Sequence, residues 1–223
     1  MALPAPPAPA HRGRRSKSSR SHVPSVSAAR RRLLFDAVAG AAALGLSPLA
    51  AAASAPGRVK KLSGTDIALP TGDVHDFDFF VGRWTFSNRR LKRRWVGSDE
   101  WDEFPASLSC ESRMGGMVNI DEGVFPTKGW QGMTVRVFNL KERRWYLYWI
   151  NNTTGELFPP VAGGFDGDRG EFFGDDHDDG RPVKIRFRWT RVDADHARWE
   201  QAFSLDGKDW ETNWLMEHTR VKA

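Results

Sequence analysis

From residue 76 onwards, apolar and polar residues alternate with a period of two in most of the chain. Residues 181–189 are the clearest case, because every second residue from Val183 to Trp189 is apolar and the residues between are basic. Residues 197–205 repeat the pattern with Trp199, Gln201 and Phe203 on one side. A period of two is typical of strands, and no segment shows the period of an amphipathic helix longer than a turn or two. The pattern predicts an all-β fold.

Turn-forming residues divide this part of the chain into short strands. Glycine, aspartate and asparagine gather at residues 151–155, 165–168, 174–180 and 205–209. We interpret the acidic segment 174–180, GDDHDDG, as a wide solvated hairpin tip and predict no metal site there. Roughly eight to ten strands at this spacing favour a sandwich or a barrel. Short hairpins throughout favour a single antiparallel barrel, which leaves no edge strand exposed.

The alternation begins at Gly82-Arg83-Trp84. This tripeptide resembles the Gly-x-Trp that opens the first strand of lipocalins and other calycins. In addition, residues 77–84 (FDFFVGRW), 89–104, 159–176 and 198–220 are similar to a bacterial lipocalin-like family of unknown function. The resemblance spans about residues 76–221. It implies a calycin-type barrel closed at one end by Arg220 packing on Trp84, and it implies no catalytic residue.

The first 53 residues differ in composition from the rest. A segment rich in Pro, Ala, Ser and Arg leads to Arg30-Arg31-Arg32-Leu33-Leu34, an Ala/Gly/Leu stretch and small residues up to Ala53. This layout is typical of an export signal, and the paired arginines resemble a twin-arginine signal. An organellar presequence is the alternative. We predict an unstructured leader over 1–53, a linker over 54–75, a lipocalin-like domain over 76–223, and a periplasmic or secreted protein without a stable membrane anchor.

Charge and cysteine content exclude several classes of function. The net charge is +5, but residues 1–55 carry eight Lys and Arg against one acid, so the remainder is mildly acidic. We therefore expect no nucleic-acid partner, since a basic surface is the usual requirement. Cys110 is the single cysteine, which excludes an intrachain disulfide and thiolate metal sites.

The abundance of tryptophan indicates a ligand cavity. All ten tryptophans lie between Trp84 and Trp214, more than packing of a small barrel requires. We predict an exported barrel that binds a small apolar or aromatic molecule. A filled barrel with a structural or envelope role is one alternative. The predicted ligand-binding residues are Trp149, Trp189, Trp199, Gln201, Trp214 and Arg136.

The other alternative is a calycin-fold isomerase, hydratase or cyclase. An enclosed carboxylate or histidine would serve as its acid–base residue, with Glu103 and His218 as candidates. Strand phase directs Glu200 and Glu211 outward and Thr212 inward. We predict no cofactor. Haem with His75 or His218 as axial ligand is the alternative, because some calycin-type barrels bind haem through one histidine.

One strand is apolar on both faces. In residues 145–149, Trp145, Leu147 and Trp149 share one face, while Tyr146 and Tyr148 share the other. One of these faces must be covered by a loop, by the segment before residue 76, or by another subunit. We therefore hypothesise a homodimer formed through this strand.

Overall fold

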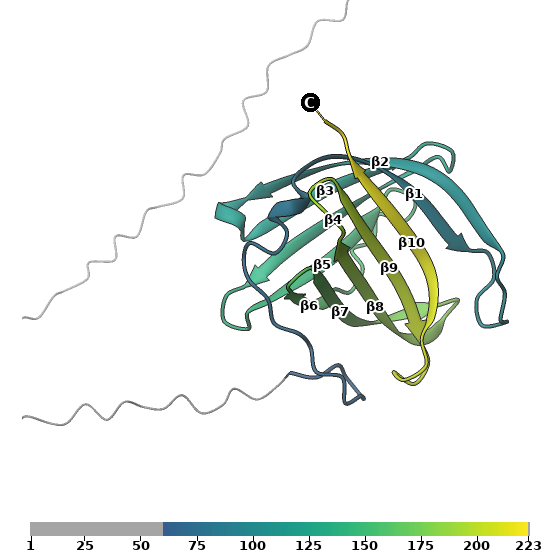
Figure 1. Ribbon diagram of the computed structural model, residues 1–223. Coiled ribbons are helices and arrows are strands. Elements are labelled where there is room, and N and C mark those ends of the chain that lie inside the picture. The colour runs from purple at the N-terminus through teal and green to yellow at the C-terminus, as the bar shows by residue number, and fades with distance from the viewer. Residues whose placement is uncertain (1–59, 223) are drawn as a thin grey trace, which may run out of the picture. The chain divides into compact units, whose positions relative to one another are not determined.

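The computed structural model describes residues 60–222 and forms a closed antiparallel barrel (Figure 1). The all-β barrel predicted from the alternation is thereby confirmed. Each strand pairs with its neighbours in the chain, and β10 pairs with β1 to close the sheet. The ten strands are β1 (Gly82–Leu91), β2 (Trp101–Arg113), β3 (Val118–Phe125), β4 (Trp130–Asn139), β5 (Arg144–Asn151), β6 (Val161–Asp166), β7 (Arg169–Asp178), β8 (Arg181–Arg191), β9 (His196–Ser204) and β10 (Glu211–Arg220).

Two single-turn 3₁₀ helices, η1 (Asp78–Phe80) and η2 (Met114–Gly116), accompany the strands. Within residues 60–222, no helix is long and apolar enough to cross a membrane. The leader over 1–53 and residues 54–59 of the expected linker lie outside the described residues.

The segment that we expected to be a linker packs on the outside of the barrel from residue 60. Leu62 and Leu69 are buried with Phe173 of β7. Lys60 donates a hydrogen bond of 2.6 Å to the hydroxyl of Tyr146 on β5. The segment therefore covers the outer face of β5 at Tyr146, which was one of the three ways of covering that strand.

The chain then turns inward and closes one end of the barrel, here called the floor. The floor consists of residues 73–81, including η1. Trp84 donates its indole hydrogen to the carbonyl of Phe80 at 2.8 Å. The guanidinium of Arg220 lies 4.2 Å from the centre of the Trp84 ring and donates to the carbonyl of Val81 at 2.7 Å. This cation–π contact and these hydrogen bonds join the first and last strands to the floor.

A bulge in β10 changes which residues face inward. The register shifts between Thr212 and Trp214, so that Trp214 lies opposite Gln201 while Glu211 lies opposite Phe203. An extra residue in one strand shifts the alternation by one position. The expectation that Thr212 faces inward and Glu211 outward was therefore wrong.

The acidic segment 174–180 is also different from its prediction. β7 continues to Asp178, and the turn consists of Asp179 and Gly180, both with positive φ. Such a two-residue turn suits a tight hairpin. Because the strand continues, Asp176 and Asp178 alternate with outward residues and face the interior, where they line the cavity described below.

Candidate functional site

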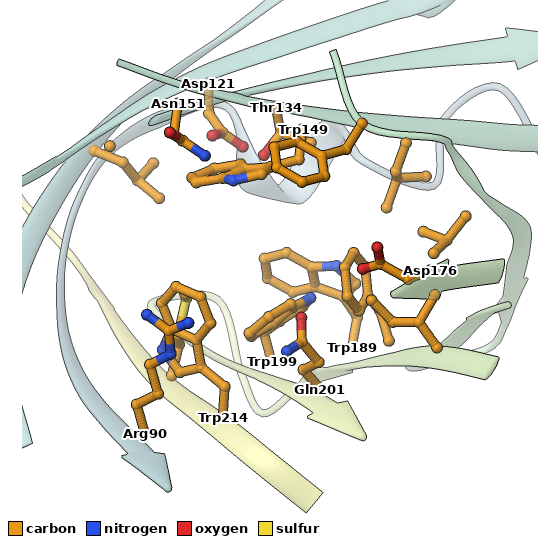
Figure 2. Close-up of a pocket in the computed structure, with 18 of the residues that line it drawn as sticks. Arg90, Asp121, Thr134, Trp149, Asn151, Asp176, Trp189, Trp199, Gln201 and Trp214 are labelled. Carbon is orange, nitrogen blue, oxygen red and sulfur yellow. The ribbon is translucent and has the colours of Figure 1, made fainter. Parts of the chain in front are cut away.

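The barrel contains a cavity of about 410 Å³ that opens at the end opposite the floor, here called the mouth. Ten strands give a wider interior than the eight that side chains can fill. The volume lies within the range of about 300–1,000 Å³ that is usual for small-molecule sites. Figure 2 shows tryptophan side chains from several strands around an open space, with a few polar groups between them.

All six residues predicted to bind a ligand line this cavity. Edge-to-face contacts connect the tryptophans of its wall. Trp199 and Trp214 have ring centres 5.7 Å apart, and Trp130 lies 6.2 Å from both Trp149 and Trp214. Such contacts stabilise the wall and hold its rings in defined orientations.

Two neighbours fix the orientation of individual tryptophans. Asn88, fully buried on β1, accepts the indole hydrogen of Trp214 at 3.0 Å. Gly132 on β4 leaves the room that Trp149 occupies, because a Cβ atom at residue 132 would lie 2.0 Å from Cη2 of that ring. The cavity wall therefore depends on two residues that sequence reasoning missed.

The two predicted polar anchors differ in how their groups are used. Gln201 donates its amide hydrogen to Asn213, the bulge residue of β10, at 2.8 Å. Its carbonyl oxygen makes no hydrogen bond within residues 60–222, and Gln201 lines the cavity. The guanidinium of Arg136 is instead held by protein groups, so Gln201 is the freer of the two for a ligand.

Arg136 forms a buried ion pair near the floor. It contacts the carboxylate of Asp121, and the two side chains are 3% and 6% exposed. Arg136 also donates to Asn119 at 2.7 Å, and its guanidinium lies 4.9 Å from the centre of the Phe77 ring. A buried ion pair needs such additional partners to offset the loss of hydration. The lone thiol, Cys110, donates to Asn119 as well, and burial raises its pKa to about 11, so it is not a nucleophile.

His218 is enclosed by aromatic rings at the floor. Phe86 stacks on the imidazole with ring centres 4.8 Å apart, and Trp189 lies 5.4 Å away. Burial lowers the pKa of His218 to about 3, against the effect of the Ala197 carbonyl and with a further contribution from Arg136. The imidazole is therefore neutral at physiological pH.

The two acid–base candidates do not share a site. Glu103 is exposed on the outer face of β2 and pairs with Arg89 at 3.2 Å. Inward residues of β2 are its neighbours Asp102 and Phe104, because Phe104 lies opposite the buried Asn88. Glu103 is thus not enclosed, whereas His218 is.

The mouth carries charged groups that sequence reasoning missed. Arg90 continues the inward series of Trp84, Phe86 and Asn88 on β1, and its guanidinium lies 4.8 Å from the centre of the Trp214 ring. Asp176 on β7 accepts a hydrogen bond from the backbone of His177 at 2.7 Å. Burial raises the pKa of Asp176, and the charges of Asp178 and Glu156 add to this increase. The period of two extended from Trp84 would have assigned Arg90 to the interior.

A loop between β1 and β2, residues 92–100, is attached to the opposite side of the mouth. Arg94 donates from Nε to both carboxylate oxygens of Asp178 at 3.0 and 2.9 Å. Trp95 donates its indole hydrogen to Asp178 at 2.6 Å and its backbone hydrogen to Glu211 at 2.9 Å. Burial alone would raise the pKa of Asp178, but the hydrogen bonds from Arg94 and Trp95 outweigh it and lower that pKa. We call this loop the latch.

The two histidines considered as haem ligands lie in different surroundings. His75 lies outside the cavity and pairs with Asp78 at 2.8 Å. His218 is covered on its faces by Phe86 and Trp189, and the edge of Phe80 packs against it. His218 nevertheless lines the cavity, and its Nδ1 is buried and makes no hydrogen bond within residues 60–222. Within residues 60–222, no three His, Cys, Asp or Glu side chains group as a metal site.

Comparison with known proteins adds no family to this description. The chain matches no model of a known protein family, and a search of curated proteins finds no match. The barrel architecture is consistent with a calycin-like protein.

Proposed function

We propose that this protein is an exported, lipocalin-like barrel that binds one small, largely apolar or aromatic molecule. The observation that carries the proposal is the cavity of about 410 Å³, whose lining is mostly tryptophan and other apolar side chains. Apolar walls provide most of the affinity in such sites, and isolated polar groups orient the ligand. Gln201 and Arg90 have the free polar atoms for that role.

The same aromatics could have filled the barrel, as a purely structural protein requires. Two features favour binding instead. The floor is densely packed around Trp84 and His218, so stability of the fold is provided at that end. In contrast, Trp149 and Phe187 are only partly buried although they point inward. Large apolar side chains left partly exposed in a concave site favour a ligand that completes their burial.

A matched pair of tryptophan variants tests this proposal. Trp149→Ala removes part of the cavity wall, whereas Trp101→Ala removes a tryptophan from the outer face of β2, opposite Leu91 of β1. With a panel of apolar compounds measured by calorimetry, we expect Trp149→Ala to weaken binding about tenfold or more and Trp101→Ala to leave it unchanged. Loss of about 1.5–3 kcal/mol per large apolar contact is the basis of this estimate. Equal effects of both variants would count against the cavity as the binding site.

An enzyme of the same fold is the second candidate, and Asp176 favours it. This carboxyl group lines the cavity and has a raised pKa, as a general acid requires. Asp176→Asn separates the two functions, because a binder retains its affinity and an enzyme loses turnover while it retains binding.

Export is proposed from the leader. The paired arginines at residues 30 and 31 and the small residues before Ser54 support a twin-arginine route to the periplasm or beyond. We expect the mature protein to begin at Ser54, which N-terminal sequencing of the exported form checks. Replacement of Arg30 and Arg31 by lysine should leave the precursor unprocessed. Processing that is unaffected by this replacement would contradict the twin-arginine route.

A further inference from the structure

The cavity contains three arginines, and two of them are neutralised by protein carboxylates. Arg136 near the floor pairs with Asp121, and Arg94 in the latch pairs with Asp178. Arg90 forms no ion pair and no side-chain hydrogen bond within residues 60–222, although it lines the same cavity. Arg90 is therefore the one cavity arginine of the described chain that has no carboxylate partner.

The carboxylates near Arg90 are already engaged. Asp178 accepts hydrogen bonds from both Arg94 and Trp95. Asp102 lies opposite Arg90 in the β1–β2 register and pairs with Lys128 at 2.5 Å. Since each of these acids has its own cation, the charge of Arg90 is left for another partner.

The guanidinium of Arg90 is also oriented in advance. It packs 4.8 Å from the centre of the Trp214 ring, and Trp214 is held by Asn88. Partial loss of hydration and the nearby charge of Arg94 lower the pKa of Arg90, although the side chain is still exposed at the mouth. A cation beside another cation, with reduced hydration, is stabilised when an anion binds.

We propose that the ligand carries a carboxylate, which Arg90 binds at the mouth while the apolar body of the ligand lies among the tryptophans. This inference rests on the proposed function. Arginine binds carboxylates through two parallel hydrogen bonds, which gives both affinity and orientation. The position at the mouth keeps the carboxylate partly hydrated and so avoids most of the cost of burying a charge.

Asp176 does not oppose this arrangement. In Figure 2 Arg90 and Asp176 lie on opposite sides of the open space. Asp178, the β7 acid whose charge acts on Arg90, is paired with Arg94. The polar groups deeper in the cavity include Gln201, Thr134, the Arg136–Asp121 pair and the neutral His218. None of them offers an unpaired positive charge, so the carboxylate has one favourable end of the cavity.

Calorimetry with two isosteric probes tests the proposal on the mature full-length chain. The probes are 2-naphthoate and its neutral amide, 2-naphthamide, which differ in charge and not in shape. We expect the wild-type protein to bind naphthoate about 10- to 100-fold more tightly than naphthamide, as a hydrogen bond to a charged group predicts. Decanoate and decanamide as a second pair distinguish an aliphatic from an aromatic body.

Variants at two adjacent arginines complete the test. Arg90→Gln should abolish the preference for naphthoate and change the affinity for naphthamide by less than about threefold. Arg89→Gln is the matched control, because Arg89 points outward and pairs with Glu103. Equal affinity of the wild type for both probes, or equal losses for both in Arg90→Gln, would overturn the carboxylate site and leave the cavity as a binding site. Failure of all four probes to bind would overturn the proposed function as well.

Discussion

Arg94 and Asp178 lie 84 residues apart in the chain, yet Arg94 donates to both oxygens of the Asp178 carboxylate. This ion pair attaches the loop after the first strand to the hairpin between β7 and β8. The pair is mostly buried, with side chains 23% and 6% exposed, so it is stronger than a surface ion pair. Two segments that are remote in sequence therefore form this part of the cavity wall together.

Asp178→Asn should release the latch. The variant loses the charge that both Arg94 and Trp95 contact, and we expect the free energy of unfolding to fall by about 1.5–3 kcal/mol. Amide hydrogen exchange in residues 92–100 should accelerate, and ligand association and dissociation should both become faster. Asp175→Asn is the control, because the exposed Asp175 faces outward and pairs with the half-buried Lys184. Unchanged exchange of the loop in Asp178→Asn would disprove the latch.

The latch should persist in mildly acidic solution. The pKa of Asp178 is lowered from its ordinary 3.8. For such a carboxyl group the stabilisation is complete above the ordinary pKa and is lost as the pH falls through the lower pKa of the folded protein. Hydrogen exchange of the loop, corrected for intrinsic rates, should therefore be constant from pH 7 to about pH 5. Release of the loop within that range would show that another group controls it.

Gly132→Ala should reduce the cavity from inside. A Cβ atom at residue 132 would lie 2.0 Å from Cη2 of Trp149, so the indole must move into the ligand space. We expect ligand affinity to fall about tenfold or more and stability to fall by about 1–3 kcal/mol, as in other overpacked cores. Gln131→Ala, an exposed neighbour, is the control. The double variant Gly132→Ala/Trp149→Leu should recover the lost stability, and failure to recover would mean that the backbone, and not Trp149, limits residue 132.

The buried pair of Arg136 and Asp121 predicts a strong dependence of each residue on the other. Asp121→Ala leaves a buried guanidinium without its carboxylate. We expect the free energy of unfolding, measured with urea, to fall by about 3–5 kcal/mol. Asp121→Ala/Arg136→Met removes both charges and should be more stable than Asp121→Ala alone. If the two substitutions are additive, the residues do not interact in the way that their contact implies.

His218 should make the fold sensitive to acid. Its pKa is lowered from 6.5 to about 3, so the unfolded chain binds a proton between these values that the folded protein does not. The neutral His218 therefore costs no stability above pH 6.5. Below that pH the free energy of unfolding falls by about 1.4 kcal/mol per pH unit. His218→Phe should remove this dependence on pH. The difference in the free energy of unfolding between wild type and variant should therefore change by about 2–3 kcal/mol from pH 7.5 to 4.5. A constant gap would contradict the burial of a neutral imidazole.

The sequence contained enough to predict the barrel, because alternation identifies strands without knowledge of their partners. It also brought Trp149, Trp189, Trp199 and Trp214 to one cavity, since inward faces of a closed sheet meet. The bulge at Asn213 was not predictable, because one extra residue in a strand leaves the local composition unchanged. Glu211 was consequently assigned to the wrong face.

The polar half of the site was harder to predict for a different reason. Asp176 and Asp178 occur in a run of acids that looks like a solvated turn, and only the partner Arg94 explains why an acid is buried there. Likewise, Arg90 lies in a cluster of basic residues, RRLKRR, whose members have different environments. Alternation from Trp84 places Arg90 inward, but it does not report long-range pairing, which decides which of these charges are neutralised by the protein.

Native mass spectrometry of the mature protein tests the central claim most directly, namely that the cavity holds a small molecule. The protein would be expressed with its leader and purified without denaturation. We predict a stoichiometric adduct of one small molecule, which is lost or reduced in Trp149→Ala and retained in Trp101→Ala. A bare protein that also shows no calorimetric binding of 2-naphthoate, 2-naphthamide, decanoate or decanamide would contradict the account and favour a filled structural barrel.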